Sequence, residues 1–262
     1  MKPVTVIDGP GPIVLAQPHS GSFVPDDIGE ALVAEARALR DTDWRIAELY
    51  DGLVPDATIV RAEFNRYVVD ANRPPDGASL YPGQNTTGLV PLVDFDGKPI
   101  WQREPDEGDI AERLERFHRP YHEALRAALE RARAAHGFAL LYDCHSIRSE
   151  LPFLFEGRLP DLNIGTDSGR SCAPAIERAV AEACAASPFT SVVNGRFTGG
   201  WTTRHYGDPA HGIHAVQMEI AQSAYLESED APFALSRTKA AKLRDTLRQV
   251  FAAIEATFGD CT

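Results

Sequence analysis

Residues 140–153, LLYDCHSIRSELPF, place charged and metal-binding side chains directly after an apolar run. The apolar residues that open this stretch are typical of a buried strand. They are followed at once by Asp143, His145 and Arg148. Ligands of open α/β sheets bind outside the carboxyl ends of the strands. This stretch therefore predicts a central strand that delivers functional side chains to such a crevice.

Strand and helix patterns alternate along the rest of the chain. Strands are expected at residues 13–19, 57–64, 67–70, 138–144, 190–197 and 214–222, and helices at residues 27–39, 43–53, 106–136, 173–186 and 234–257. This alternation predicts one α/β domain over residues 1–262, in which a mostly parallel mixed sheet is covered by helices on both faces. Residues 71–105 are expected to form a long surface loop of the kind that acts as a lid or binding loop.

The composition is typical of a globular protein. The 262 residues are 44% hydrophobic and 24% charged. Because the sequence has no apolar run of about 18 residues and no signal-peptide pattern, we expect a soluble cytoplasmic protein with no membrane partner. The four cysteines include no CxxC pair and are expected to be reduced thiols. A formal charge of −12 and a pI of about 5.1 argue against a nucleic-acid partner, because phosphate binding needs a basic surface.

Two histidines occupy equivalent positions at the ends of predicted strands, His19 after the first and His145 after the strand at 138–144. A single histidine at a strand end can be explained as a hydrogen-bonding residue. A pair of histidines at one sheet edge favours a shared metal ion. Strand alternation places Asp143 on the face of His145, either as its orienting partner or merely as a neighbour. Cys144 points to the opposite face.

A catalytic zinc site usually has three protein ligands, so a third one is expected. Asp41 and Asp43 open the next predicted helix, and helical geometry places Asp43 on its apolar face with Ile46 and Tyr50. Asp41 is explained as an N-cap residue. Asp43 is either the third ligand or a first-turn acid favoured by the helix dipole.

Glu219 stands in the middle of the apolar strand at 214–222. An ionised glutamate in that position is costly unless it is paired or functional. Glu219 is therefore either half of a buried salt bridge with an arginine or a general base that takes a proton from the attacking water.

Several arginines beside turns and strand ends form a candidate anion site. Guanidinium groups bind carboxylates through paired hydrogen bonds, so an acidic small-molecule substrate fits, although each arginine could instead form a routine surface ion pair. The candidates for substrate binding are Arg66, Asn72, Arg73, Arg204 and His205. Arg148 is a candidate for contact with the substrate, and either Arg148 or Arg66 is a candidate for contact with the developing oxyanion. The GxSxG, Walker and GxGxxG motifs are absent, which argues against those hydrolase and nucleotide-binding classes.

Six motifs follow one another across residues 18–225. They are PHSG (18–21), DTDW with LYD (41–51), RYVVDANRP (66–74), DCHSI (143–147), GGWTTRHYG (199–207) and QMEIAQSAY (217–225). Together they resemble the N-formylglutamate amidohydrolase family. The resemblance implies hydrolysis of N-formyl-L-glutamate to formate and L-glutamate, the last step of one route of histidine degradation. It also implies kinship with zinc carboxypeptidase-like hydrolases.

The kinship implies roles for residues that match those motifs. His19 and His145 resemble the histidine ligands of zinc, Glu219 resembles the base, and Asn72 with Arg73 resembles a clamp for the substrate carboxylate.

One departure concerns the acidic ligand. The peptidases carry HxxE, but Ser22 stands three residues after His19, so the acid must come from elsewhere. The helix-face argument selects Asp43.

The resulting hypothesis is an amidohydrolase that uses Zn²⁺ or another divalent metal, bound by His19, Asp43 and His145, with Glu219 as the base. Two alternatives stay open. One is an amidohydrolase for a different N-acyl amino acid, and the other is a non-catalytic binder of acidic metabolites.

Overall fold

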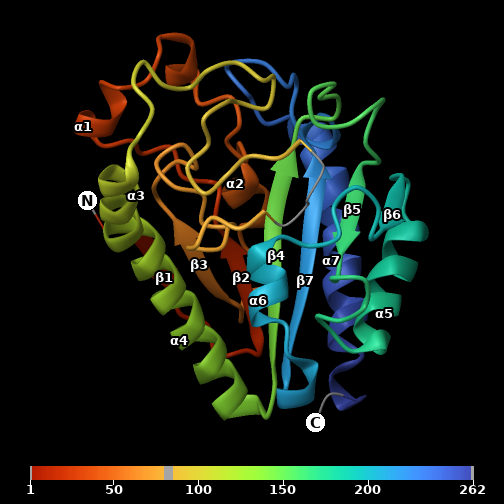
Figure 1. Cartoon of the computed structure of the whole chain (residues 1–262). Coiled ribbons are helices and arrows are strands. Elements are labelled where there is room, and N and C mark those ends of the chain that lie inside the picture. Colours follow the sequence, from red (N-terminus) through yellow and green to blue (C-terminus); the bar gives the residue numbers. More distant parts are fainter. Residues whose placement is uncertain (1, 80–84, 261–262) are drawn as a thin grey trace.

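The computed structural model describes residues 2–79 and 85–260, and within them seven strands form one sheet in the order β1-β3-β2-β4-β7-β5-β6 (Figure 1). Four neighbouring pairs are parallel, whereas β1–β3 and β5–β7 are antiparallel. The prediction of a mostly parallel mixed sheet is confirmed. The strands are β1 (Val4–Ile7), β2 (Ile13–Gln17), β3 (Thr58–Ala62), β4 (Ala139–Ile147), β5 (Leu162–Gly165), β6 (Ser191–Val193) and β7 (Ile213–Ala221).

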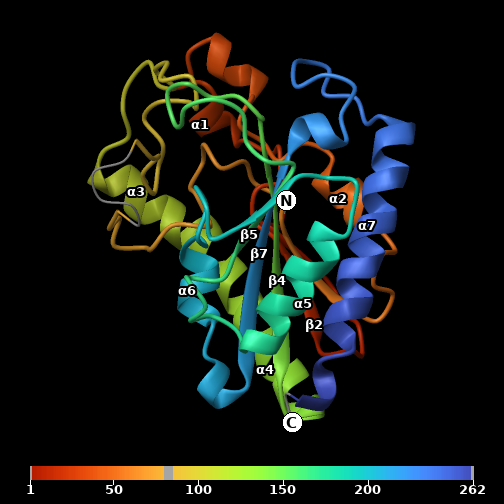
Figure 2. The same cartoon turned by 90° about the vertical axis from the view of Figure 1, so that its right-hand side faces the viewer.

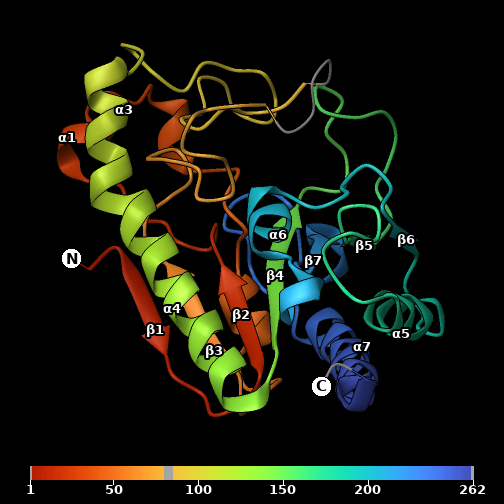
Figure 3. The ribbon, with the colours of Figure 1, turned by 60° about the horizontal axis from the view of Figure 1, so that its bottom comes forward.

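Helices cover both faces of this sheet, as predicted (Figure 2). One core lies under α2 (Ile46–Tyr50), α5 (Pro174–Ala185) and α7 (Arg237–Glu255). The second core lies on the opposite face, under α4 (Arg119–His136). Seen from below, α4 runs along the end of the sheet that holds β1, β2 and β3, and α5 and α7 lie toward the other end (Figure 3).

Strand β4 is buried along its whole length, because both of its faces are covered. Leu140, Tyr142 and Cys144 pack into the core under α5 and α7. Leu141 packs into the core under α4. Because side chains alternate between the faces of a strand, His145 continues the face of Leu141, and Cys144 points away from it as predicted.

The longest predicted helix, at 106–136, forms as three joined segments. These are α3 (Glu107–Arg113), a π-helical turn (Leu114–His118) and α4. Asp106 and Asp109 form a capping box at the start of α3, which satisfies backbone N–H groups of its first turn. Gly137 ends α4 in the left-handed conformation, at φ 84°, directly after the last residue of the predicted helix.

The predicted helix at 27–39 is wrong in its extent. It is replaced by the short α1 (Asp26–Gly29) and a 3₁₀ turn (Glu35–Ala38). Leu32 forms an antiparallel bridge with Trp101, and the N–H of Val33 donates to the carbonyl of Ile100. These contacts with the long loop take the backbone out of a helix.

The predicted strand at 67–70 is also wrong. Its N–H groups bond elsewhere, because Asp70 donates to the carbonyl of Leu89 at 2.7 Å and Val68 donates to the carbonyl of Asn65 at 2.9 Å. Val68 and Val69 are fully buried all the same, so their apolarity reflects the core rather than a strand.

Three short elements escaped prediction. They are β1, β5 and the helix α6 (Trp201–Tyr206), which lie in segments where neither a strand nor a helix was expected. The long segment 71–105 is, as expected, without helix or extended strand among its described residues. It lies over the carboxyl ends of β2 and β4 at the top of Figure 1. No helix in the described part of the chain is both long and apolar enough to cross a membrane.

Candidate metal centre and substrate cavity

Three predicted metal ligands meet at the carboxyl ends of β2 and β4. One donor atom from each of His19, Asp43 and His145 lies within 4.8 Å of the other two, and all three residues are buried. Asp43 Oδ2 lies 3.2 Å from His145 Nδ1 and 3.8 Å from His19 Nδ1. Asp43 precedes α2, and its N–H donates to the carbonyl of His19 at 3.0 Å, which fixes the loop against the strand end. The two imidazole centroids are 4.9 Å apart.

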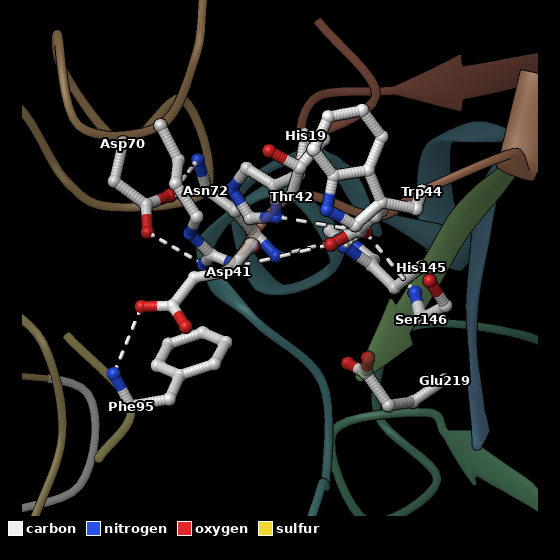
Figure 4. Close-up of polar contacts among 12 residues, drawn as sticks. His19, Asp41, Thr42, Trp44, Asp70, Asn72, Phe95, His145, Ser146 and Glu219 are labelled. Atoms are coloured by element: carbon white, nitrogen blue, oxygen red, sulfur yellow. Dashed lines mark hydrogen bonds and ion pairs between the residues drawn. The ribbon is translucent and has the colours of Figure 1, made fainter. Parts of the chain in front are cut away.

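The remaining nitrogen of each imidazole faces a buried carboxylate. His19 Nε2 lies 2.7 Å from Asp70 Oδ1, and His145 Nε2 lies 3.1 Å from Asp143 Oδ2. A carboxylate at Nε2 favours the tautomer protonated there and leaves Nδ1 with its lone pair, as in metal-binding histidines. Figure 4 shows Asp70 on the side of His19 away from His145. Asp143, considered from the sequence as an orienting residue, is placed where it can act as one.

Two buried atoms of this group have no hydrogen-bond partner among the described residues. They are His19 Nδ1 and Asp43 Oδ1. Buried polar atoms are normally satisfied, so these two point to a partner that is not a protein group. Two imidazole nitrogens and one carboxylate oxygen form the donor set of many catalytic zinc sites. The residues present therefore fit a divalent cation.

Asp41 is held away from this centre. Its Oδ2 accepts a hydrogen bond from the N–H of Phe95 at 2.8 Å (Figure 4). Its Oδ1 accepts one from Arg148 at 3.3 Å. Burial raises the pKa of Asp41 to about 6 despite the neighbouring Arg66 and Arg148. Of the two aspartates considered from the sequence, Asp43 is the one that faces the histidines.

Asp70 connects several parts of the site. Its carboxylate accepts hydrogen bonds from Arg66 at 2.9 Å and from the N–H of Asn72 at 2.8 Å, besides its contact with His19. Burial alone would raise the pKa of Asp70, but the charges of His19, Arg66 and Arg73 outweigh it and hold that pKa well below its usual value. Asp70 is therefore a buried anion. The sequence shows this carboxylate directly after the apolar run YVV, but that pattern alone did not predict a function for Asp70.

A cavity with about 570 Å³ of empty space, including its open mouth, adjoins the centre. Its wall contains three arginines, Arg66, Arg73 and Arg196, and one carboxylate, Glu219. The net charge of the chain is −12, so this positive wall is a local feature. The other lining residues are His19, Asn72, Asn85, Thr86, Thr87, Phe95, His145, Ile147, Leu154, Phe197, Gly200 and Gln217.

Glu219 enters the cavity from β7. It is the cross-strand neighbour of His145 on β4, and its Oε2 accepts a weak hydrogen bond from Gln217 at 3.4 Å. Burial raises the pKa of Glu219 above its usual value, so this carboxylate exchanges protons closer to neutral pH than an exposed glutamate does. Figure 4 shows its carboxylate beside the end of β4.

The three predicted substrate ligands on the 66–73 segment line the cavity, but much of their hydrogen-bonding capacity is already used. Arg66 donates to Asp70 and to the carbonyl of Asp41. Asn72 accepts from the N–H of Thr202 at 2.8 Å, and its amide nitrogen lies 3.1 Å from His145 Nε2. Arg73 donates to the carbonyl of Thr87 at 2.8 Å and to the hydroxyl groups of Thr86 and Thr87.

The structure does not bring three predicted residues to the cavity wall. Arg148 pairs with Asp41 and with Asp96, at 3.0 Å from the latter. Arg204 donates to the carbonyl of Gly199 and to the hydroxyl of Thr198. His205 stacks on Trp201 beside a different surface depression. The segment that holds Arg204 and His205 was expected to be a loop, whereas α6 turns both residues away from the buried Thr202 and Thr203.

Arg196 and Phe197 line the cavity but were not singled out from the sequence. They follow β6, and Arg196 donates to the carbonyl oxygens of Leu154 and Asn85. The available signal was their position at the carboxyl end of the predicted strand at 190–197, although in the structure β6 already ends at Val193.

Comparisons with known proteins show the family of this chain. A family model described as N-formylglutamate amidohydrolase matches residues 11–226. The chain belongs to this family. A curated N-formylglutamate deformylase of Pseudomonas putida is 46% identical over 94% of the chain and 92% of its own length. One from Pseudomonas aeruginosa is 43% identical over 94% of the chain and 93% of its own length.

A solved structure supports the same assignment. The N-formylglutamate amidohydrolase of Ralstonia eutropha JMP134 is 28% identical and superposes with a TM-score of 0.83, covering 99% of this chain and 100% of that one. The family match begins just before β2 and ends just after β7. It therefore contains His19, Asp43 and His145.

Proposed function

We propose that the protein hydrolyses N-formyl-L-glutamate to formate and L-glutamate, with a divalent cation, Zn²⁺, held by His19, Asp43 and His145. The observation that carries the proposal is the buried His-Asp-His group at the edge of an arginine-lined cavity. The names of the curated relatives support this substrate.

A cation bound by the three ligands would supply Lewis-acid chemistry, polarising the formyl carbonyl and acidifying the attacking water. The other steps of the reaction are carried out by side chains of this protein.

Glu219 accepts the proton of the attacking water, because among the described residues it is the one carboxylate on the cavity wall. Water then adds to the formyl carbon. When the C–N bond breaks, Glu219 passes the proton to the leaving nitrogen, so that formate and the free amine of glutamate are the products.

Arg66 holds a fixed positive charge beside the reacting carbon. Its Nη1 lies 3.7 Å from Asp43 Oδ1, and its guanidinium stacks over the ring of Phe95 at 4.7 Å. Fixed charges aimed at a developing oxyanion need no reorganisation during the reaction. Arg66 thus stabilises the tetrahedral stage from a position that its bonds to Asp70 and Asp41 keep rigid.

The test is formate release from N-formyl-L-glutamate by protein purified without chelators. We expect activity that is lost on treatment with a strong chelator and restored by added Zn²⁺, with the far-UV circular dichroism unchanged. Faster cleavage of N-acetylglutamate or N-formyl-L-aspartate would instead support an amidohydrolase for another N-acyl amino acid. Protein that binds no metal and releases no formate would support a binder of acidic metabolites.

A further inference from the structure

The three arginines that line the cavity differ in what they contact. Arg66 touches that group directly, at 3.7 Å from Asp43. Arg73 is one step removed, because its Nη1 lies 4.0 Å from Asp70, the partner of His19. Arg196 instead contacts the carbonyl oxygens of Leu154 and Asn85, which belong to two other loops.

An apolar strip accompanies these charges along the wall. Ile147, Leu154 and Phe197 line the cavity and belong to one small hydrophobic cluster. The guanidinium of Arg196 lies 5.3 Å from the centre of the Phe197 ring, which holds its charged end against this strip. The cavity therefore offers cationic groups together with an apolar surface suited to methylene groups.

The two carboxylates of N-formylglutamate also lie at different distances from the reacting formyl group. In an N-formyl amino acid the α-carboxylate is attached to the carbon that carries the reacting nitrogen, so it must lie near the metal-binding group. The side-chain carboxylate of glutamate is two methylene groups farther away. A guanidinium fork binds such a carboxylate through paired, charge-assisted hydrogen bonds.

We propose that Arg196 binds the side-chain carboxylate of the substrate and thereby selects glutamate, while Arg73 binds the α-carboxylate. This inference rests on the proposed function, since it needs the reacting carbon to lie at the His19, Asp43 and His145 group. It assigns to Arg196 a role in specificity and none in the chemical step. Ile147, Leu154 and Phe197 contact the two methylene groups of the glutamate side chain.

The experiment compares N-formyl-L-glutamate with N-formyl-L-glutamine, which has the same shape but no side-chain charge. The wild type should prefer the glutamate substrate by about 100-fold in kcat/KM, because removing one partner of a desolvated charge pair has an effect of that order. Arg196→Gln should abolish this preference. It should raise KM for the glutamate substrate with kcat within about threefold, and change kcat/KM for the glutamine substrate by less than about threefold.

Two further variants separate charge from packing. Arg196→Lys keeps the positive charge but not the fork, so it should recover part of the preference. Arg158→Gln removes an exposed arginine that pairs with Glu150 outside the cavity, and it should behave as the wild type does. An equal loss on both substrates in Arg196→Gln would mean that Arg196 only supports the loop, and would overturn the proposal.

A binding measurement keeps this inference distinct from the proposed function. Calorimetric titration with L-glutamate and L-glutamine needs no turnover, and the wild type should bind L-glutamate about 100-fold more tightly, a difference that Arg196→Gln removes. If no formate is released but this binding difference appears, the reaction is wrong and the role of Arg196 stands. If formate is released without any preference between the two substrates, the reaction stands and the role of Arg196 is refuted.

Discussion

Replacing Asp70 with asparagine removes a negative charge from behind His19 while nearly keeping the shape of the side chain. In the folded protein this carboxylate accepts from His19 at 2.7 Å, from Arg66 at 2.9 Å and from the N–H of Asn72 at 2.8 Å. An asparagine amide has a single acceptor oxygen for these donors and turns a second donor toward one of them. Asp70→Asn therefore weakens the hold on His19 and leaves Arg66 with less compensation.

Two magnitudes follow from these contacts. A group that orients a metal-binding histidine typically contributes about 10- to 100-fold to metal affinity, which is about 1.4 to 2.7 kcal/mol. Breaking a buried ion pair from one side costs about 3 to 5 kcal/mol of stability. The lower end applies here, because Arg66 keeps its bond to the carbonyl of Asp41 and its approach to Asp43. We expect Asp70→Asn to fold, to unfold at a lower temperature, and to bind Zn²⁺ about 10- to 100-fold more weakly.

The assay is competition for Zn²⁺ between the protein and a chelating dye, at a fixed pH and below the unfolding temperature of the variant. Asp245→Asn is the matched control, because Asp245 pairs with Arg248 on the exposed side of α7. It should change neither the zinc affinity nor the unfolding temperature. A zinc affinity of Asp70→Asn within twofold of the wild type, in a protein of lowered stability, would show that Asp70 only neutralises Arg66 and would refute its role in orienting His19.

Three further outcomes are expected. Glu219→Gln should keep about one Zn²⁺ per chain by elemental analysis while formate release falls by a factor of about 100 or more, because the variant lacks the proton acceptor; unchanged turnover would exclude Glu219 as the base. Asp43→Ala should lose most of its bound metal, whereas Asp41→Asn should retain it, since Asp41 is bonded to Phe95 and Arg148 rather than facing the histidines; the reverse pattern would exchange their roles. Cys184 should react with iodoacetamide at pH 8 roughly a thousandfold more slowly in the folded than in the unfolded chain. The reason is that burial raises the pKa of Cys184 to about 12, and the thiolate is the reactive form. Equal rates of modification in the two states, measured by mass spectrometry, would contradict this.

Hydrophobic periodicity predicted the elements whose burial is continuous. Strand β4, strand β7 and helix α4 are long, and each is packed against a core along its length. The two strands are buried on both faces and appear as apolar runs, whereas the apolar residues of α4 recur with the helical period. The alternation of side chains along a strand also predicted that His145 and Cys144 would point to opposite faces. The helix-face argument assumed a helix that begins at residue 43, and this is wrong, because α2 begins only at Ile46. Asp43 faces the histidines from the loop before α2, where its N–H donates to the carbonyl of His19.

The wrong predictions have a common cause in contacts between segments far apart in the sequence. Leu32 and Trp101 form an antiparallel β-bridge that no local sequence pattern predicts. The N–H of Asp70 donates to the carbonyl of Leu89. The dependence on distant contacts also explains why the contacts of the arginines were not predicted correctly. A guanidinium reaches its partner through a long side chain, so Arg148 and Arg196 could not be distinguished as ion-pair partner and cavity residue until the loops around them were placed.

The arrangement of charge explains why Arg148 is kept away from the cavity. Four carboxylates, those of Asp41, Asp43, Asp70 and Asp143, are buried around two imidazoles, and buried anions must be compensated. Arg66 compensates Asp70 and approaches Asp43, and Arg148 compensates Asp41. Moving Arg148 into the cavity would leave Asp41 without this ion pair, and the pKa of Asp41 is already raised to about 6 by burial.

Asp43 is compensated less fully than Asp70. Its approach to Arg66 is 3.7 Å, beyond hydrogen-bonding distance, and its Oδ1 accepts no hydrogen bond in the part of the chain that the structure describes. His19 Nδ1 has no hydrogen-bond partner there either. A carboxylate oxygen and an imidazole lone pair that face one buried space are both ligand atoms for a divalent cation, which would also compensate the carboxylate charge. The buried charges thus favour a divalent cation beside Asp43.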